Sequence, residues 1–260
     1  MSIYACSDLH GQYDLWKQIK EYIKPEDTLY CIGDMIDRHI KGWDIVDEIM
    51  TMKNVIFIRG NHEDMAAGAF KAILQNIFWS QRYSDWLRNK GDLTCPQRIL
   101  DNPREMEKYM DYFEGLEVRK EIYVGKKKIL LDHSGFVVTQ EPAGGWYIHQ
   151  PMWDRDHFFE NWPATEEYKD TYLIHGHTPT WFFDQKMKGF YSEYPLYAAG
   201  YVGKDIEKWK EYDPKIIWYA DGHKVNIDMG SYFTNIAALL NLDTFEEIYF
   251  KQEVKDDKLK

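Results

Sequence analysis

Five short fragments combine glycine with side chains that can bind metal ions. They are Ser-Asp-Leu-His-Gly at 7–11, Gly-Asp-Met-Ile-Asp-Arg at 33–38, Arg-Gly-Asn-His-Glu at 59–63, Asp-His-Ser-Gly at 132–135 and His-Gly-His-Thr-Pro at 175–179. Carboxylate and amide oxygens, together with imidazole nitrogens, are the donors that a hydrolytic site with two cations uses. Each fragment follows an apolar stretch that is typical of a strand. The sequence therefore indicates such a site at the ends of several strands.

The elements that must position these fragments alternate between strands and helices. Apolar runs at 2–6, 28–32 and 55–58 predict strands, and apolar positions within 12–24 and 43–52 recur at a helical spacing. Strand, helix, strand, helix, strand is the pattern of a parallel sheet. Ligands bind beyond the carboxyl ends of the strands in such sheets, and the first three fragments fall there.

The rest of the chain adds more strands and a helical insertion. Further strands are expected in hairpins at 122–131 and 216–227, at 171–174, and in a final pair within 235–250. Helical periodicity between about 78 and 120 predicts an insertion beside the sheet. Because no repeat or linker divides the chain, we expect a single domain over residues 1–260.

Composition excludes several classes of function. The formal net charge of −11 argues against broad nucleic-acid binding, which needs many contacts from lysine and arginine to phosphates. The three cysteines, Cys6, Cys31 and Cys95, are too few and too far apart for a disulfide framework, and we expect buried free thiols. No leader segment precedes the first fragment, and no apolar run approaches the roughly 20 residues of a membrane span. We therefore expect a cytoplasmic protein that binds neither nucleic acid nor membranes.

In this order, the five fragments resemble the motifs of the calcineurin-like metallophosphoesterases. The likeness is to their phosphoprotein phosphatase branch, with its bacterial and phage Ser/Thr phosphatases and the related diadenosine tetraphosphatases. Residues 225–230 and 237–243 also resemble the closing strands of that branch. The resemblance implies an α/β fold in which a two-sheet sandwich is flanked by helices, in four layers α/β/β/α.

By this resemblance, six residues would bind two metal ions. The ligands would be Asp8 and His10 for the first ion, Asp34 bridging both, and Asn61, His133 and His177 for the second. A shared carboxylate suits cations about 3.5–4 Å apart. Imidazole favours manganese, our first expectation, or iron, zinc or nickel, over magnesium and calcium. Taken singly, each residue also has an ordinary explanation as a cap, a turn residue or a surface histidine.

The resemblance also assigns a proton donor. His62 would protonate the leaving oxygen, and Asp37 would accept a hydrogen bond from the other ring nitrogen of His62. The alternative is that His62 only caps the helix that follows it.

Two arginines are candidates for binding phosphate oxygens, because a guanidinium fork matches a phosphoryl group. Arg38 follows from the second fragment, although His39 stands where the family usually has glycine. Arg155 resembles the second phosphate-binding arginine of the family; alternatively, it forms an ion pair with Asp154 or Asp156.

Other residues near these motifs have two interpretations. We expect His175 to support the site and not to bind metal. Aromatic residues around Trp146, Tyr147, Trp153, Trp162 and the run 181–183 either stack a nucleobase or simply pack the core, and packing is the expected role.

Together these features predict a dinuclear metal-dependent phosphatase. A water bridging the two ions would attack phosphorus directly in phosphomonoesters, including phosphoserine and phosphothreonine in proteins. The binding partner is then a phosphorylated protein or a small phosphoester. One alternative is a dinucleoside polyphosphate hydrolase, and another is an inactive metal-binding scaffold that acts through protein contacts.

Overall fold

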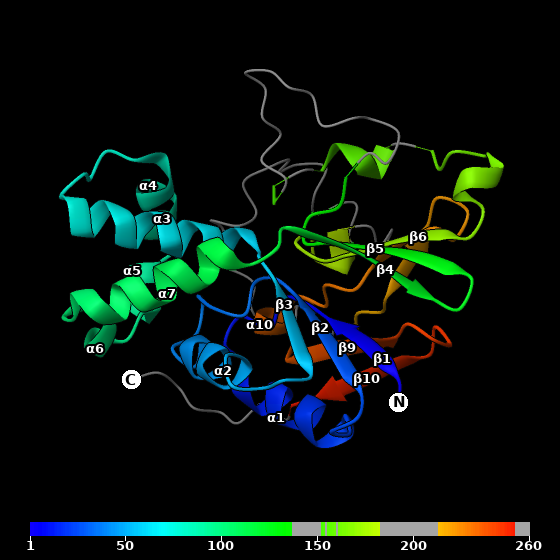
Figure 1. Ribbon diagram of the computed structural model, residues 1–260, viewed down its shortest axis with the longest axis horizontal. Helices are drawn as coiled ribbons and strands as arrows, with labels where there is room; N and C mark the ends of the chain where they lie inside the picture. Colours follow the sequence, from blue (N-terminus) through cyan, green and yellow to red (C-terminus); the bar gives the residue numbers. More distant parts are fainter. Residues whose placement is uncertain (137–151, 154, 160, 183–212, 253–260) are drawn as a thin grey trace.

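Two five-stranded sheets form the centre of the computed structural model, which describes residues 1–136, 152–153, 155–159, 161–182 and 213–252 (Figure 1). The first sheet has the order β10-β9-β1-β2-β3. Its strands are β1 (Ile3–Cys6), β2 (Thr28–Ile32), β3 (Val55–Ile58), β9 (Ile236–Asn241) and β10 (Glu247–Lys251). Strands β1, β2 and β3 are parallel, as their sequence pattern predicts, and β9 and β10 are antiparallel.

The second sheet has the order β4-β5-β6-β8-β7. Its strands are β4 (Arg119–Val124), β5 (Lys127–Asp132), β6 (Thr171–His175), β7 (Ile217–Tyr219) and β8 (Lys224–Asn226). Strands β5, β6 and β8 are parallel, and antiparallel β4 and β7 form the edges. Each sheet therefore offers a group of parallel strands whose carboxyl ends can carry a site.

The two sheets pack face to face over a shared apolar core. Ile32 and Ile58 of the first sheet belong to the same buried cluster as Leu131, Ile174 and Val225 of the second. Alternate residues of these strands face outward instead, because side chains of a strand alternate between its two faces. The expected sandwich is confirmed.

Helices cover the outer face of the first sheet (Figure 1). They are α1 (Tyr13–Tyr22), α2 (Gly42–Ile49), α3 (Asn61–Gln75), α4 (Gln81–Arg88), α5 (Gly91–Thr94), α6 (Gln97–Leu100) and α7 (Pro103–Gly115). The short α10 (Ser231–Thr234) lies between β8 and β9 in the chain. Much of the aromatic content fills this layer: the Trp43 ring lies 5.7, 5.1 and 5.9 Å from those of Phe70, Tyr109 and Phe113. Within the stretch expected to be a helical insertion, α7 packs on this core through Tyr109 and Phe113.

The outer face of the second sheet has a different cover in the described part of the chain. Leu130 and Leu173 pack there against Trp162, and the nearby segments are 3₁₀ helices at Asp156–Phe159 and Glu166–Tyr168. A further 3₁₀ helix spans Thr180–Phe182. Each is too short to bury a wide apolar face of its own.

Several boundaries differ from the expected ones by one or more residues, and two of these differences have a clear physical reason. Strand β4 begins at Arg119, earlier than the apolar pattern indicates, because it is an edge strand whose polar residues alternate between partly buried and exposed. Strand β9 begins at Ile236, because Asn235 takes a left-handed conformation that ends α10.

The expectation of buried free thiols is confirmed. Cys6, Cys31 and Cys95 are all buried and unbridged. The sulfur atoms of Cys6 and Cys31 lie 3.8 Å apart on adjacent strands of the first sheet.

Candidate active site

The candidate site residues lie in loops at the carboxyl ends of parallel strands from both sheets. Asp8, Asp34 and Asn61 follow β1, β2 and β3, whereas His133 and His177 follow β5 and β6. The backbone N–H of His177 donates to Asp8 Oδ2 at 3.0 Å, which joins a loop of the second sheet to one of the first. Segments far apart in the sequence therefore meet at one place.

Two groups of buried ligand atoms share Asp34. Donor atoms of His10, Asp34 and His62 lie within 4.8 Å of one another, and so do those of Asp34, His133 and His177. Asp34 Oδ1 is 3.3 Å from Nε2 of His133, and Oδ2 is 3.7 Å from Nε2 of both His10 and His62. One carboxylate thus faces two sets of donors, which is the arrangement that a pair of neighbouring cations needs.

Backbone carbonyls fix the orientation of two imidazole rings. Nδ1 of His10 lies 2.9 Å from the carbonyl oxygen of Ile36, and Nδ1 of His133 lies 2.9 Å from that of Ile32. Because a carbonyl can only accept, Nδ1 carries the proton in each ring. In both rings Nε2 is then the nitrogen that faces the centre of the site and can bind a cation, as in many histidine metal ligands.

Asn61 and Asp8 lie beside these groups. Asn61 Oδ1 is 2.9 Å from both His133 Nε2 and His177 Nδ1. Asp8 belongs to neither group, but it is buried, and burial together with the nearby Asp228 carboxylate raises its pKa well above the usual value. A cation next to Asp8 would offset this unfavourable burial of negative charge.

The charge state of Asp34 also fits cation binding. Burial alone would raise its pKa, but the imidazoles of His133 and His62 reverse that effect and hold the pKa well below its usual range. Burial would likewise lower the pKa of His133, but Asp34 and Asp8 raise it to about 10. A cation that takes His133 as a ligand must therefore displace a proton.

The other two imidazoles are neutral. Burial, followed by the charge of Arg38, lowers the pKa of His10 well below its usual value. Burial and then Arg155 do the same for His177. His177 Nε2 is buried and has no hydrogen-bond partner among the described residues. Neutral imidazoles with a free lone pair suit a transition-metal ion, so this donor set fits the expected metals.

Backbone strain is concentrated at the site. Left-handed conformations, with φ between 45 and 66°, occur at Asp8, His10, Asp34, Asp37, Arg38 and His177. Such conformations cost on the order of 1–3 kcal/mol each and cluster at functional sites. His39 is not among them and is exposed, so the place of the usual glycine requires no glycine geometry in this chain.

Two glycines of the fragments leave room for the carboxylates. A Cβ atom on Gly60 would lie 2.3 Å from Asp34 Oδ1, and one on Gly176 would lie 2.0 Å from Asp8 Oδ2. Any side chain at these positions would displace a candidate ligand. The pairing of glycine with Asp, Asn and His in the fragments thus has a steric reason.

His62 makes a short hydrogen bond to Asp37. Its Nδ1 lies 2.6 Å from Asp37 Oδ2, and both side chains are buried. The Nε2 atom is left on the side of Asp34. Since the imidazole bonds a carboxylate from another loop, its contacts differ from those of a helix cap. Thr94 of the insertion lies 3.4 Å from the other Asp37 oxygen, and nothing in the sequence linked these two residues.

Glu63 supports the Asp34 loop, a role that the sequence interpretation missed. Its carboxylate accepts backbone N–H groups of Asp34, Met35 and Gly60 at 2.9, 2.9 and 3.0 Å. The bond to Gly60 is one half of a capping box, which the spacing between positions 60 and 63 could have indicated. Glu63 therefore fixes both the start of α3 and the loop that carries Asp34.

Arg38 has no carboxylate within ion-pair distance among the described residues. Its guanidinium carbon lies 5.7 Å from the ring centroid of Phe233, and Phe233 meets Trp181 edge to face at 5.4 Å. Its Nε is buried and has no hydrogen-bond partner in the described part of the chain. The aromatic platform holds a cation that is free to bind an anion.

Arg155 is the second candidate for phosphate binding, and the carboxylates of Asp228 and Asp34 act on it. Burial lowers its pKa, while Asp228 and Asp34 raise it. Trp153, two residues earlier, meets the His177 ring edge to face at 5.9 Å, which places this segment at the site. The alternative ion pairs of Arg155 fall outside what the structure describes, because Asp154 and the Asp156 side chain are among the undescribed parts.

Asp228 is a further residue at the site, and no sequence motif assigned it a role. It is buried, and burial raises its pKa to about 7, with Asp34 acting in the same direction and Arg38 in the opposite one. Its Oδ1 accepts the N–H of Gly230 at 2.7 Å. Only the fold brings this carboxylate, from the loop after β8, near both arginines.

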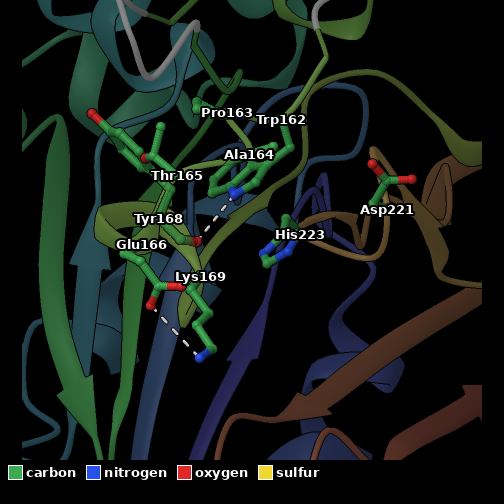
Figure 2. A pocket seen from close by; sticks show the side chains of 9 residues that line it. All are labelled: Trp162, Pro163, Ala164, Thr165, Glu166, Tyr168, Lys169, Asp221 and His223. Carbon is green, nitrogen blue, oxygen red and sulfur yellow. Dashed lines mark hydrogen bonds and ion pairs between the residues drawn. The ribbon is translucent and has the colours of Figure 1, made fainter.

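The described aromatic residues outside the helical layer also serve in packing. Trp162 stacks on His223 at 5.1 Å with an interplanar angle of 2°. A pocket of about 350 Å³ next to this pair is lined by Trp162, Pro163, Ala164, Thr165, Glu166, Tyr168, Lys169, Asp221 and His223 (Figure 2). It contains none of the candidate site residues. Trp146, Tyr147 and Phe183 lie outside the described residues.

Comparisons with known proteins agree with this geometry. A family model for calcineurin-like phosphoesterases matches residues 1–253. A putative diadenosine tetraphosphatase has a similar structure, with a TM-score of 0.54, 10% identity, and 97% of this chain and 94% of that chain covered. A Saccharomyces cerevisiae serine/threonine phosphatase similar to human PP5 has a TM-score of 0.54 at 12% identity, with 99% of this chain and 82% of that chain covered. A metallophosphoesterase from Sphaerobacter thermophilus has a TM-score of 0.51 at 15% identity, with 98% of this chain and 90% of that chain covered. At these identities, the likeness establishes the fold.

Two negative findings complete the comparison. Among curated proteins, none matches the sequence. Within the described residues, every helix falls short of the length and apolar character that crossing a membrane requires.

Proposed function

The chain belongs to the calcineurin-like phosphoesterase family, and we propose that it is a phosphatase that uses two divalent cations to hydrolyse phosphomonoesters, including phosphoserine and phosphothreonine in proteins. The observation that supports this most strongly is the pair of buried donor groups sharing Asp34. The donor set favours manganese, with iron, zinc or nickel as alternatives. When bound, such cations lower the pKa of an attacking water and offset the charge of the phosphoryl oxygens.

The cation ligands in this proposal are the six residues expected from the sequence. They are Asp8, His10, Asp34, Asn61, His133 and His177. The proximity of donor atoms supports the assignment of His10, Asp34, Asn61, His133 and His177. Asp8 is buried beside them, with Oδ2 3.0 Å from the backbone nitrogen of His177.

The arginines and His62 act on the substrate. Arg38 and Arg155 would bind the non-reacting phosphoryl oxygens, because a guanidinium donates two parallel hydrogen bonds to a phosphoryl group. His62 would donate a proton from Nε2 to the leaving oxygen as its bond to phosphorus breaks. The Asp37 carboxylate, 2.6 Å from Nδ1, keeps that ring in one orientation during the transfer.

Metal content and turnover, measured on matched variants, test the proposal. The purified protein loaded with manganese should contain close to two ions per chain and hydrolyse p-nitrophenyl phosphate. His62→Asn should keep the metal and lose about 10²–10⁴ in rate, since it removes the proton donor but not the ligand set. An H62N variant with full metal content and near-normal rate would refute the acid role.

The substrate class needs a separate comparison. Phosphopeptide hydrolysis should exceed cleavage of diadenosine tetraphosphate under the same conditions. The reverse order would favour a dinucleoside polyphosphate hydrolase, in line with the similar structure of a putative diadenosine tetraphosphatase. A metal-loaded protein that cleaves no phosphoester would favour the scaffold instead.

A further inference from the structure

A buried chain of polar side chains adjoins the loops that carry His133 and His177. His157 and His175 have no exposed surface, and Lys224 is 1% exposed, which is rare for a lysine. The hydroxyl of Tyr219 lies between the two imidazoles, 2.8 Å from Nε2 of His175 and 3.2 Å from Nδ1 of His157. The members come from β6, β7, β8 and the 3₁₀ helix Asp156–Phe159.

His157 is held from several sides. Its Nε2 lies 2.8 Å from the carbonyl oxygen of Ser134, and its own carbonyl accepts a hydrogen bond from the ammonium of Lys224. Gly135, at φ 84°, leaves space for the ring: a Cβ there would lie 2.5 Å from Nε2 of His157. The imidazole of His157 thus packs against the loop that follows β5, in space that the absent side chain of Gly135 leaves open.

The direction of the hydrogen bonds follows from their acceptors. The carbonyl of Ser134 can only accept, so His157 Nε2 carries the proton. Burial, with His175 and Lys224 acting in the same direction, lowers the pKa of His157 to about 2, so its Nδ1 is unprotonated. Nδ1 of His175 lies 3.1 Å from the carbonyl oxygen of Gly176, so Nε2 of His175 is unprotonated too. The Tyr219 hydroxyl, with its single proton, therefore lies between two acceptor nitrogens and links the two rings. Removal of the hydroxyl breaks this link.

This chain of contacts connects three functional segments. Ser134 directly follows His133, His175 lies two residues before His177, and Arg155 lies two residues before His157. We propose that His157 is a positioning residue that fixes the Arg155 segment against both histidine loops, so that the guanidinium is in place before phosphate binds. The inference rests on the phosphate-binding role proposed above for Arg155.

The physical benefit is preorganisation. Arginine has a long side chain, and ordering such a side chain on binding reduces affinity. Arg155 stands in a segment that is not part of a strand or an α-helix, so contacts of neighbouring residues must order it. His157, two residues after Arg155, makes three such contacts: its ring bonds Ser134 and Tyr219, and its carbonyl accepts from Lys224.

A double-mutant cycle on the full chain, loaded with manganese, tests this. The binding of inorganic phosphate is measured by calorimetry for wild type, His157→Ala, Arg155→Ala and the double variant. We expect His157→Ala to weaken phosphate binding about tenfold in the wild-type background and to have no further effect once Arg155 is absent. The KM for p-nitrophenyl phosphate should rise by a similar factor, with metal content unchanged.

Two more variants complete the design. Tyr219→Phe removes one hydroxyl and should weaken phosphate binding less than His157→Ala does, again only when Arg155 is present. If His157→Ala does not fold, Tyr219→Phe replaces it in the double-mutant cycle. His223→Ala is the matched control: His223, in the turn before β8, has Nδ1 2.9 Å from the carbonyl oxygen of Thr171, and among the described residues no hydrogen bond connects it with Arg155. It should leave phosphate binding unchanged.

Each other outcome overturns the inference. An equal loss in both backgrounds means that His157 acts on the fold or the metal and not through Arg155. Unchanged phosphate binding in Arg155→Ala, with hydrolysis intact in the wild type, removes the inference but leaves the proposed phosphatase standing. If the wild type neither binds phosphate nor hydrolyses phosphoesters, the proposed function itself fails.

Discussion

Replacement of Glu63 by glutamine should disturb the site without touching a metal ligand. The carboxylate is fully buried and uses both oxygens: Oε2 accepts N–H groups of Asp34 and Gly60, and Oε1 accepts that of Met35, at 2.9–3.0 Å. Glutamine has nearly the same shape, but one of its two terminal atoms is an NH₂ group. In either orientation, that group must face a backbone N–H.

The expected loss follows from these bonds. The better orientation keeps the Asp34 and Gly60 bonds and loses those to Met35 and, at 3.4 Å, to Ile36, which leaves buried N–H groups unpaired. Burial and the charge of Asp34 raise the pKa of Glu63 to about 7, so the comparison is made at a pH well above that value, where the carboxylate is charged. A hydrogen bond to a charged group contributes about 1.5–3 kcal/mol, and the two remaining bonds weaken when the acceptor becomes neutral. The lower cost of burying a neutral amide offsets part of this. We expect the free energy of unfolding to fall by about 3 kcal/mol, and the Tm by roughly 6–12 °C.

Thermal unfolding with and without manganese measures both consequences. Glu63→Gln should lower the Tm of the metal-free protein and also reduce the shift that manganese produces, because the Asp34 loop is no longer fixed. Glu107→Gln, an exposed change on α7, is the matched control and should alter neither quantity. A Tm within roughly 2 °C of wild type, together with an unchanged manganese effect, would refute the role assigned to Glu63.

Three further changes have defined outcomes. Saturating manganese should stabilise the wild type by about 4 kcal/mol at a thousand times its Kd, and Asp34→Asn should abolish that gain; a retained shift in thermal unfolding would contradict the bridging role. Arg38→Lys should raise KM for an aryl phosphate about tenfold at constant metal content, because lysine lacks the bidentate fork; an unchanged KM would count against phosphate binding there. Burial would raise the pKa of Asp27, but hydrogen bonds from the backbone N–H groups of Lys24 and Ser2 lower it overall. The ionised carboxylate therefore stabilises the folded state fully above the unfolded-state pKa of about 3.9, and this stabilisation is lost as the pH falls through the lower pKa of the folded state. Asp27→Asn should therefore reduce stability in urea at pH 7 but not near pH 2, and an equal difference at both would disprove the assignment.

The sequence alone determined the parallel strands of the first sheet and the order of the metal-binding fragments. Apolar runs such as 28–32 and 55–58 are local signals, because a buried strand must be apolar along its own length. Glycine beside Asp34 or Asn61 is also a local signal, since the loop that turns at a strand end carries both. The family resemblance rested on these fragments, and the family match over residues 1–253 agrees with it.

Only the tertiary structure decided which residues support those fragments. Thr94 contacts Asp37 across 57 positions, and His157 bonds Tyr219 across 62. No periodicity or motif links such pairs, because their proximity depends on how helices and sheets pack and not on neighbouring residues. The left-handed conformation at Asp34 is likewise imposed by its surroundings, among them the Glu63 carboxylate that accepts its N–H. The candidate ligands could thus be predicted from local sequence, whereas the residues that hold them in place could be identified only from the packing of the folded chain.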